Sequence, residues 1–259
     1  MKKIIKISYL VILLLTVNNL VNSAEKVELL KTDWSFKGLF GKFDRGSLQR
    51  GYQVYSEVCA SCHSMKYVSF RNLAEPGGPE FSEEQVKAIA ANFEVIDGPN
   101  NDGEMFERPA KLSDKFVKPY ENVKAAQAAN GGAYPPDMSV LAKARSGGVD
   151  YIYSILLGYE DPPIGVTLED GVHYNKYMYG NNIKMAKPLS DNLIEYSDGT
   201  VASEEQMAKD VTTFLMWAAE PHLESRHAMG FKAIIYLIIL TILVYFSMKK
   251  VWSRIESEV

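Results

Sequence analysis

The stretch Cys59-Ala60-Ser61-Cys62-His63 decides what kind of domain this chain forms. Two cysteines separated by two residues and followed at once by histidine are the attachment signature of c-type haem. Two thiols about one helical turn apart can each form a thioether with one vinyl group of the porphyrin, and the adjacent imidazole then ligates the iron. We therefore predict one covalently bound haem c, with His63 as the proximal iron ligand.

Other uses of this motif fit less well. The two cysteines are the only ones in the chain, whereas a structural zinc site needs about four Cys or His ligands. The remaining histidines, His173, His222 and His227, lie far downstream without zinc-finger spacing. A thioredoxin-like thiol pair is the stronger alternative, but that motif needs no histidine after its second cysteine.

Residues 1–24 have the pattern of a secretory signal peptide. Three lysines precede a short apolar core over residues 7–17, and small residues follow it. The alternative, an N-terminal membrane anchor, would need a longer apolar core. A mitochondrial presequence would be amphipathic and rich in arginine, and this segment has no arginine. Bacterial export is therefore the better interpretation.

Residues 231–248 form a second hydrophobic run, interrupted only by Lys232 near its start. A helix of this length spans roughly 27 Å at about 1.5 Å per residue, close to the ~30 Å hydrocarbon core of a bilayer. Basic residues follow in the segment 249–259, which favours a cytoplasmic tail. The alternative, a buried core helix, does not account for these flanking charges.

The two ends of the chain predict the same topology. Residues 25–230 form one exported haem domain on the periplasmic side of a bacterial inner membrane, and a single helix crosses the lipid bilayer to a cytoplasmic C-terminus.

The exported domain is more acidic than the whole chain. The chain carries a net charge of −4, its first segment three lysines, and the residues from 232 onward a net charge of +2, so −9 remains for the domain. An acidic surface disfavours nucleic acid, and it either steers a basic partner or maintains solubility. Because both cysteines are assigned to haem, no disulfide is expected despite the oxidising compartment.

Helix signals recur along the domain, and strand signals are sparse. Four helices are predicted to begin at Ser47, Ser82, Asp150 and Ser203, the second and fourth with a capping box. Apolar residues at helical spacing give their inward faces. In chain order these are Leu48, Tyr52, Tyr55 and Cys59; Val86, Ile89 and Phe93; Ile152, Ile155, Leu156 and Tyr159; and Met207, Val211, Phe214, Leu215 and Ala218.

Long loops rich in Gly, Pro and Asn separate these helices. The segments 97–109, 130–136 and 160–179 each hold several turn-forming pairs, so we expect extended irregular chain there. The predicted fold class is mainly α, with long loops wrapped around a flat cofactor.

The sixth coordination position of the iron distinguishes two functions. An open position allows a small molecule to bind or react, whereas a sixth protein ligand indicates electron transfer. His173, His222 and His227 would allow bis-histidine ligation, but the last two lie next to the membrane helix. Met207 and Met216 belong to a helix core, and Met65 is too close to His63. The methionines that remain in loops are Met105, Met138, Met178 and Met185, of which Pro188 favours the last by stiffening its loop.

Several motifs in one order make the chain resemble the cytochrome c1 family, the haem-bearing subunits of the ubiquinol–cytochrome c reductase (cytochrome bc1) complex. The resemblance covers nearly the whole exported domain and the anchor. It is carried by Arg50–Tyr55 leading into the haem motif, Gly103–Pro109, Ala133–Ser139, Lys143–Gly148, Asp150–Ser154 and Trp217–Pro221.

The resemblance implies a cytochrome c-like haem domain with long loop insertions and one C-terminal transmembrane helix. It implies thioethers at Cys59 and Cys62. Met185 matches the family's axial methionine, Arg145 an arginine that pairs with a haem propionate, and Tyr151 a tyrosine that contacts the haem. One departure is that Met178-Tyr179-Gly180 stands where the family often has Phe-Pro-Gly.

The pair Pro135-Pro136 belongs to one of these motifs. The resemblance also implies that one of its two carbonyl oxygens orients the imidazole of His63 and so fixes its tautomer.

The resemblance also implies a function. The chain would pass electrons from a Rieske iron–sulfur protein to a cytochrome c, beside cytochrome b in a membrane complex, and would not be an enzyme by itself. Two alternatives stay open: a stand-alone membrane-tethered electron shuttle, and a haem peroxidase-type enzyme with an exchangeable sixth site.

Overall fold

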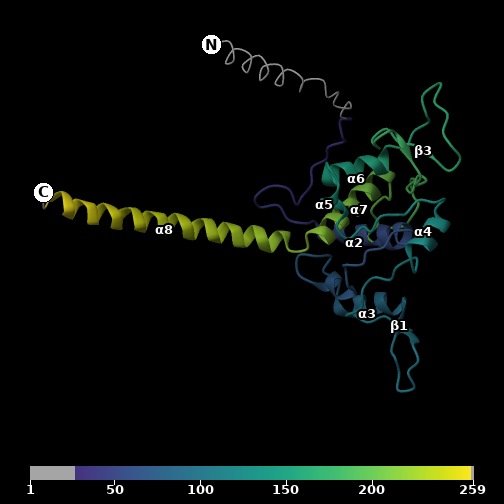
Figure 1. The fold of residues 1–259 in the computed structure, drawn as a ribbon, viewed down its shortest axis with the longest axis horizontal. Coiled ribbons are helices and arrows are strands. Elements are labelled where there is room, and N and C mark those ends of the chain that lie inside the picture. The colour runs from purple at the N-terminus through teal and green to yellow at the C-terminus, as the bar shows by residue number, and fades with distance from the viewer. Residues whose placement is uncertain (1–26, 258–259) are drawn as a thin grey trace, which may run out of the picture.

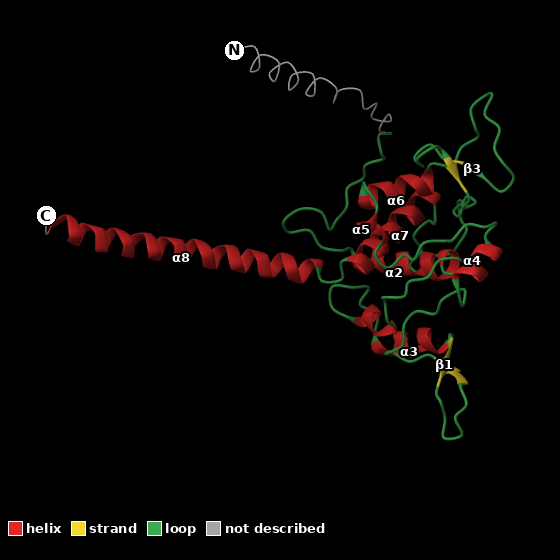
Figure 2. Ribbon diagram, viewed as in Figure 1, coloured by secondary structure: helices red, strands yellow, loops and turns green. Residues whose placement is uncertain are grey.

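The computed structural model describes residues 27–257 and consists mainly of helices joined by long loops (Figures 1 and 2). The prediction of a mainly α fold is confirmed. The predicted signal peptide lies outside the described residues. The helices are α2 (Arg45–Val54), α3 (Glu83–Ala91), α4 (Val123–Ala129), α5 (Leu141–Ala144), α6 (Gly148–Leu157), α7 (Glu204–Ala219) and α8 (Leu223–Ser257). The strands are β1 (Glu94–Asp97), β2 (Phe106–Pro109), β3 (His173–Tyr174) and β4 (Asn182–Ile183).

Helix α2 leads directly into the haem motif. Its cap is Asp44, whose carboxylate accepts from the backbone N–H of Ser47 at 2.7 Å, so the prediction of Ser47 as the cap was wrong by three residues. The helix continues as a π-helical turn, Tyr55–Cys59, followed by two bonds to the Cys59 carbonyl, from Cys62 N at 3.1 Å and His63 N at 2.9 Å. The predicted delivery of the motif from a helix end is confirmed.

The other predicted helix ends are correct in part. The capping box at Ser82 is confirmed. Ser203 caps α7, but the Gln206 side chain bonds Asp210 at 2.9 Å rather than the Ser203 backbone, so the second capping box is only half formed.

Helix α6 begins before the predicted Asp150 and ends before Tyr159. The predicted placement of Tyr159 on this helix was wrong. The amide of Asn175 donates to the Ile155 carbonyl at 2.7 Å, satisfying a carbonyl of the last helical turn. Tyr159 lies beyond this end and pairs with Asn175 in an isolated β-bridge.

The segment predicted to be irregular over 97–109 forms part of a β-hairpin instead. Strands β1 and β2 pair antiparallel, with Asp97 opposite Phe106. The guanidinium of Arg108 forms ion pairs with Asp97 and Asp114, which tie the hairpin to the following loop. The strands are too short and too polar to stand out against the turn residues between them. The segment 160–179 likewise contains β3, which pairs with β4.

Helix α7 is the centre of the core. It packs against α2, α5 and α6, with α2 as its main neighbour (Figure 1). Phe214 on α7 contacts Tyr52 on α2 and Tyr55 on the π-helical turn that follows it, with ring centroids 5.8 and 5.9 Å apart. The two helices approach so closely because Gly51 has no side chain: a Cβ there would lie 2.1 Å from the carbonyl oxygen of Asp210.

A buried carboxylate fixes the register of α2 against α7. Asp210 is fully buried and accepts from Ser47 Oγ at 2.6 Å, Arg50 Nε at 2.8 Å and Gln206 Nε2 at 2.9 Å. A buried charge is tolerated only when it is paired and hydrogen-bonded in this way. The network therefore holds the haem helix in one position along α7.

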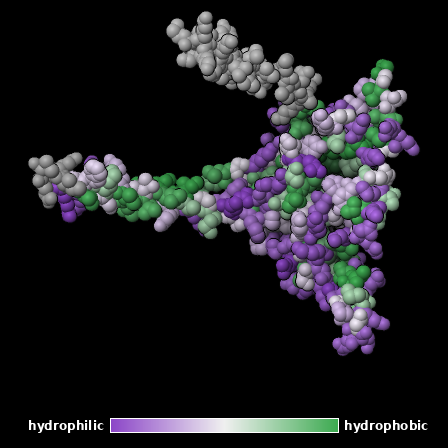
Figure 3. Space-filling model, viewed as in Figure 1, coloured by the Kyte–Doolittle hydropathy of each residue, from purple (hydrophilic) through white to green (hydrophobic). Residues whose placement is uncertain are grey.

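Helix α8 leaves the domain as one continuous 35-residue helix. Residues 223–254 of it are long and apolar enough to cross a membrane, since an 18-residue window within them has a mean hydropathy of 2.2, and the middle of the helix is hydrophobic in Figure 3. The helix is joined firmly to the domain: the Glu224 carboxylate accepts from Phe43 N at 2.8 Å and from both terminal nitrogens of Arg45, at 2.8 and 2.9 Å.

The close contact of α2 and α7 predicts a clear effect of Gly51→Ala. The added methyl group meets backbone, which cannot rotate away, so we expect a loss of about 1–3 kcal/mol in the free energy of unfolding from overpacking. The higher helix propensity of alanine offsets at most roughly 1 kcal/mol of this loss. Thermal unfolding in detergent measures it.

Gly46→Ala in the same helix is the matched control, because its Cβ would meet only side-chain ends, at 3.3 Å. Equal unfolding temperatures for the two variants would contradict this account of the helix contact.

Candidate functional site

The imidazole of His63 is buried and held by one backbone contact. Its Nδ1 lies 2.8 Å from the carbonyl oxygen of Pro136, the second residue of the proline pair. A carbonyl oxygen can only accept, so Nδ1 carries the proton and Nε2 keeps its lone pair. Nε2 has no hydrogen-bond partner among the described residues. Burial lowers the pKa of His63, against the opposing effects of Pro136 and Asp137, and so favours the neutral form that binds metals.

The thiols of Cys59 and Cys62 are both free and half-buried. Burial, together with the nearby Cys62, raises the pKa of Cys59 to about 12, so this thiol is protonated. Within residues 27–257, no group of three or more His, Cys, Asp or Glu side chains is arranged to hold a metal ion. The motif therefore offers two free thiols and one imidazole, which suit covalent haem attachment, and not the four ligands of a structural zinc site.

The loop that carries Pro136 is fastened to the residues after His63. Asp137 accepts from Ser64 Oγ at 2.8 Å, from Lys66 N at 3.0 Å and from Ser139 N at 3.0 Å. Although burial opposes it, hydrogen bonds from Ser139, Lys66 and Ser64 keep the pKa of Asp137 below its ordinary value. The carboxylate thus fixes the distance between the Pro136 carbonyl and the imidazole.

Two further contacts strengthen this joint. Met138 N donates to the Ser64 carbonyl at 2.8 Å, and Tyr67 N donates to Ser139 Oγ at 3.0 Å. On the other side of the motif, the Tyr55 hydroxyl donates to the His63 carbonyl at 3.2 Å.

Met185 is half-buried in a loop that is held at two points. Its carbonyl accepts from the Tyr159 hydroxyl at 3.0 Å, and the neighbouring Lys184 Nζ donates to the Gly131 carbonyl at 2.9 Å. Gly131 precedes the Pro135-Pro136 pair in the same loop, so this loop connects the Met185 segment with His63.

Tyr151 lies on α6, and Arg145 lies between α5 and α6. Arg145 is exposed, and in the described part of the chain its guanidinium makes no hydrogen bond or ion pair. Tyr151 is half-buried, and its hydroxyl lies 3.4 Å from the sulfur of Met178. The structure therefore joins Tyr151 to a second loop methionine rather than to Met185.

The remaining candidate methionines differ in how far their side chains are buried. Met65 and Met207 are fully buried in the core, and Met138 is 8% exposed within it. Met105 is 60% exposed and lies just before β2, at the far end of the hairpin. Of the four loop methionines, Met178 and Met185 are the two that are half-buried.

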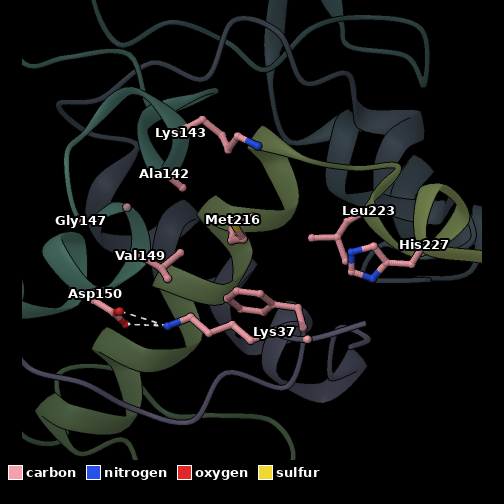
Figure 4. A pocket seen from close by; sticks show the side chains of 12 residues that line it. Lys37, Ala142, Lys143, Gly147, Val149, Asp150, Met216, Leu223 and His227 are labelled. Atoms are coloured by element: carbon pink, nitrogen blue, oxygen red, sulfur yellow. Dashed lines mark hydrogen bonds and ion pairs between the residues drawn. The ribbon is translucent and has the colours of Figure 1, made fainter. Parts of the chain in front are cut away.

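A cavity of about 300 Å³ lies where the domain meets α8 (Figure 4). Figure 4 shows Met216, Leu223 and His227 around it, across from the Lys37–Asp150 ion pair. None of the residues predicted to bind haem lines it. His227 lines this cavity, whereas Cys59, Cys62 and His63 do not.

Several positioning residues were not predicted from the sequence. Asp137 and Ser139 appeared only as letters of a motif, although an aspartate followed two residues later by serine is a common turn that binds its own backbone. Tyr159 was assigned to the inward face of a helix. Its contact with Met185 joins residues that are distant in sequence, and no local pattern indicates it.

These features define a class of protein. A helix delivers two free thiols and an imidazole with an available Nε2, and the domain that holds them continues into one long apolar helix. This is the arrangement of a membrane-anchored c-type haem protein, and the residues present fit the cofactor.

Comparison with known proteins identifies the family. The sequence profile of the Cytochrome C1 family matches residues 34–255. The chain belongs to the cytochrome c1 family, whose members are electron-carrying haem proteins.

Relatives are found in bacteria and in plants. "Cytochrome c1" of Rhodospirillum rubrum is 45% identical over 89% of both chains. "Cytochrome c1 2, heme protein, mitochondrial" of Arabidopsis thaliana is 50% identical, covering 86% of this chain and 72% of the relative. "Cytochrome b/c1" of Bradyrhizobium diazoefficiens is 52% identical over 85% of this chain, which spans only 35% of that longer protein.

The hydrogen bonds that Asp137 accepts lead to a prediction. Asp137→Ala removes the acceptor of three hydrogen bonds and leaves two backbone N–H groups without their partner. We expect the free energy of unfolding to fall by about 2–4 kcal/mol, since each bond to a charged group contributes roughly 1.5–3 kcal/mol and part is recovered from water. Thermal unfolding followed through the haem absorption measures the loss.

Asp102→Ala is the control, because this exposed carboxylate accepts no hydrogen bond from the described residues. If the two variants unfold at the same temperature, Asp137 does not hold the loop.

Proposed function

We propose that this chain is the electron-transfer subunit of a cytochrome bc1-type complex, with iron held between His63 Nε2 and Met185 Sδ. The observation that carries the proposal is the contact between His63 Nδ1 and Pro136, which leaves Nε2 free to bind metal. When bound, haem c supplies reversible one-electron transfer.

The two cysteines would attach the group covalently. Each thiol would add across one vinyl group of the haem, giving a C–S bond and a C–H bond with no leaving group.

The axial residues set the redox behaviour. A methionine sulfur stabilises ferrous iron and raises the potential. Met185 supports this role because its loop is held by Tyr159 and Lys184, both through backbone carbonyls. A ligand held in this way changes position little when the iron changes charge, which keeps the transfer fast.

Two further residues, Arg145 before α6 and Tyr151 on it, would contact the cofactor. Arg145 has an exposed guanidinium that is free of other partners in the described chain, as pairing with a propionate requires. Tyr151 would contact the haem while its hydroxyl stays near Met178.

The membrane topology belongs to the same proposal. Helix α8 would cross a bacterial inner membrane, with the haem domain in the periplasm and Lys249, Lys250 and Arg254 on the cytoplasmic side. The apolar helix would pack against cytochrome b, and the name of the Bradyrhizobium relative supports this partner.

The donor would be a Rieske iron–sulfur protein and the acceptor a cytochrome c. The net negative charge of the domain favours a basic acceptor, since attraction between oppositely charged proteins raises their rate of association. A stand-alone shuttle would need a flexible tether. The bidentate pair of Glu224 with Arg45 makes the junction rigid, and so favours a subunit of an assembled complex.

The ligand assignment is tested by Met185→Leu. We expect the sixth position to open, carbon monoxide to bind the reduced protein, and the midpoint potential to fall by on the order of 0.1 V, within the span of about 0.8 V that axial ligands cover. A redox titration with spectra measures all three.

Met178→Leu is the matched control and should leave the spectrum and the potential close to those of the unchanged protein. The opposite pattern would assign the ligand to Met178. Rapid binding of carbon monoxide by the unchanged protein would instead favour the peroxidase-type alternative.

The topology is tested with single introduced cysteines, because the two natural ones are consumed by haem. A membrane-impermeant maleimide should label Ile96→Cys in intact cells, and Ser253→Cys only after the inner membrane is permeabilised. Labelling of Ser253→Cys in intact cells would reverse the proposed orientation.

A further inference from the structure

The loop between residues 34 and 43 carries two large apolar side chains at its tip. Leu39 is 60% exposed and Phe40 72% exposed, although the aromatic residues on either side of them, Phe36 and Phe43, are buried. Exposed apolar side chains that lie next to each other form a patch, and such patches mark contact surfaces, whereas single exposed apolar residues are common.

The tip is a rigid turn rather than a loose loop. Gly38 has a φ of +88°, and Gly41 N donates to the Gly38 carbonyl at 3.2 Å, which closes a tight turn around Leu39 and Phe40. Lys42 N donates to the Ser35 carbonyl at 3.0 Å just below it. The apolar pair is therefore held outward and cannot fold back onto the domain.

An aromatic base supports the turn. The ring of Phe36 lies 5.5 Å from that of Trp34 and 5.2 Å from that of Phe43, measured between centroids. The inner side of the turn, at Phe36 and Lys37, also lines the cavity at the α8 junction (Figure 4).

The turn lies beside the first apolar turn of the membrane helix. The ring of Phe40 is 5.8 Å from that of Phe231, the residue at which the hydrophobic run of α8 begins. In Figure 1 the purple loop extends from the domain on the side where α8 leaves. Glu224 fixes this arrangement, because it binds the backbone of Phe43 at the base of the turn.

The charges around the turn suit a lipid headgroup layer. Lys37 and Lys42 flank the apolar tip and are exposed, and Lys232 on α8 follows Phe231 directly. Lys37 also forms an ion pair with Asp150, with 3.0 Å between the nitrogen and the carboxylate oxygen. Phe and Leu side chains combined with lysines are typical of amphipathic segments that lie in the membrane–water interface.

We propose that Leu39 and Phe40 insert into the boundary between headgroups and acyl chains of the leaflet that α8 enters, as a second membrane contact of this chain. This proposal rests on the membrane-spanning role proposed above for α8. A single helix leaves the domain free to tilt against the bilayer, whereas a helix and a rigid apolar turn at the same depth fix its orientation. A lipid surface is favoured over a protein neighbour because the apolar pair lies beside Phe231, where the hydrophobic run of α8 begins, and exposed lysines flank it.

The test uses the full haem-loaded chain in liposomes, spin-labelled at one introduced cysteine. Leu39→Cys reports the turn, and Leu240→Cys reports the middle of α8. Ile96→Cys is the matched control, because Ile96 is 68% exposed but lies on β1, away from α8 (Figure 1). Power-saturation EPR then compares accessibility to oxygen, which enters lipid, with accessibility to a water-soluble nickel chelate.

At position 39 we expect oxygen accessibility to exceed nickel accessibility several-fold, with the reverse at position 96. Nickel accessibility at position 39 equal to that at position 96 would overturn the proposal, and so would a label shielded from both reagents, which indicates a covering protein. The label at position 240 separates these results from failure of the membrane span, because it reports lipid whenever α8 crosses the bilayer. Phe40→Cys repeats the measurement if Leu39→Cys loses the native haem spectrum.

Discussion

A carbonyl oxygen can only accept a hydrogen bond, so the contact between Pro136 and His63 leaves the imidazole just one tautomer. The nitrogen that would face iron is then always the one with the lone pair. Much of the domain serves to keep this contact in place. Asp137 fastens the proline loop to the residues after the histidine, and α2 presents the motif from a fixed position against α7.

The same rigidity extends from the cofactor motif to the membrane. Arg45, in the first turn of the haem helix, pairs with Glu224 in the first turn of α8. The haem helix, the membrane helix and the base of the aromatic turn thus meet at one carboxylate. An electron carrier in a fixed complex benefits from this, since the distance from its iron to fixed partners then changes little.

Sequence reasoning predicted the parts of this structure that have local causes. The haem motif, the helix before it and the apolar α8 follow from spacing and composition, and the Ser82 capping box from two side chains that bond each other. Three kinds of error have physical reasons. The cap of α2 was misplaced because aspartate and serine three residues apart both suit the role, and the hairpin was hidden because its strands are short and polar. Tyr159 was assigned to α6 because its spacing is helical, yet a distant amide from Asn175 ends that helix. Which proline carbonyl meets the imidazole, and what holds it there, depends on contacts across more than seventy residues of chain, which no local pattern carries.

The central claim is that His63 is held through Nδ1 and binds metal through Nε2. NMR of the reduced, haem-loaded protein with 15N-labelled histidine tests it most directly. The account predicts a slowly exchanging proton on Nδ1 of His63, hydrogen-bonded to a carbonyl, and iron bound to Nε2. A His63 without that proton, or with iron at Nδ1, would contradict it.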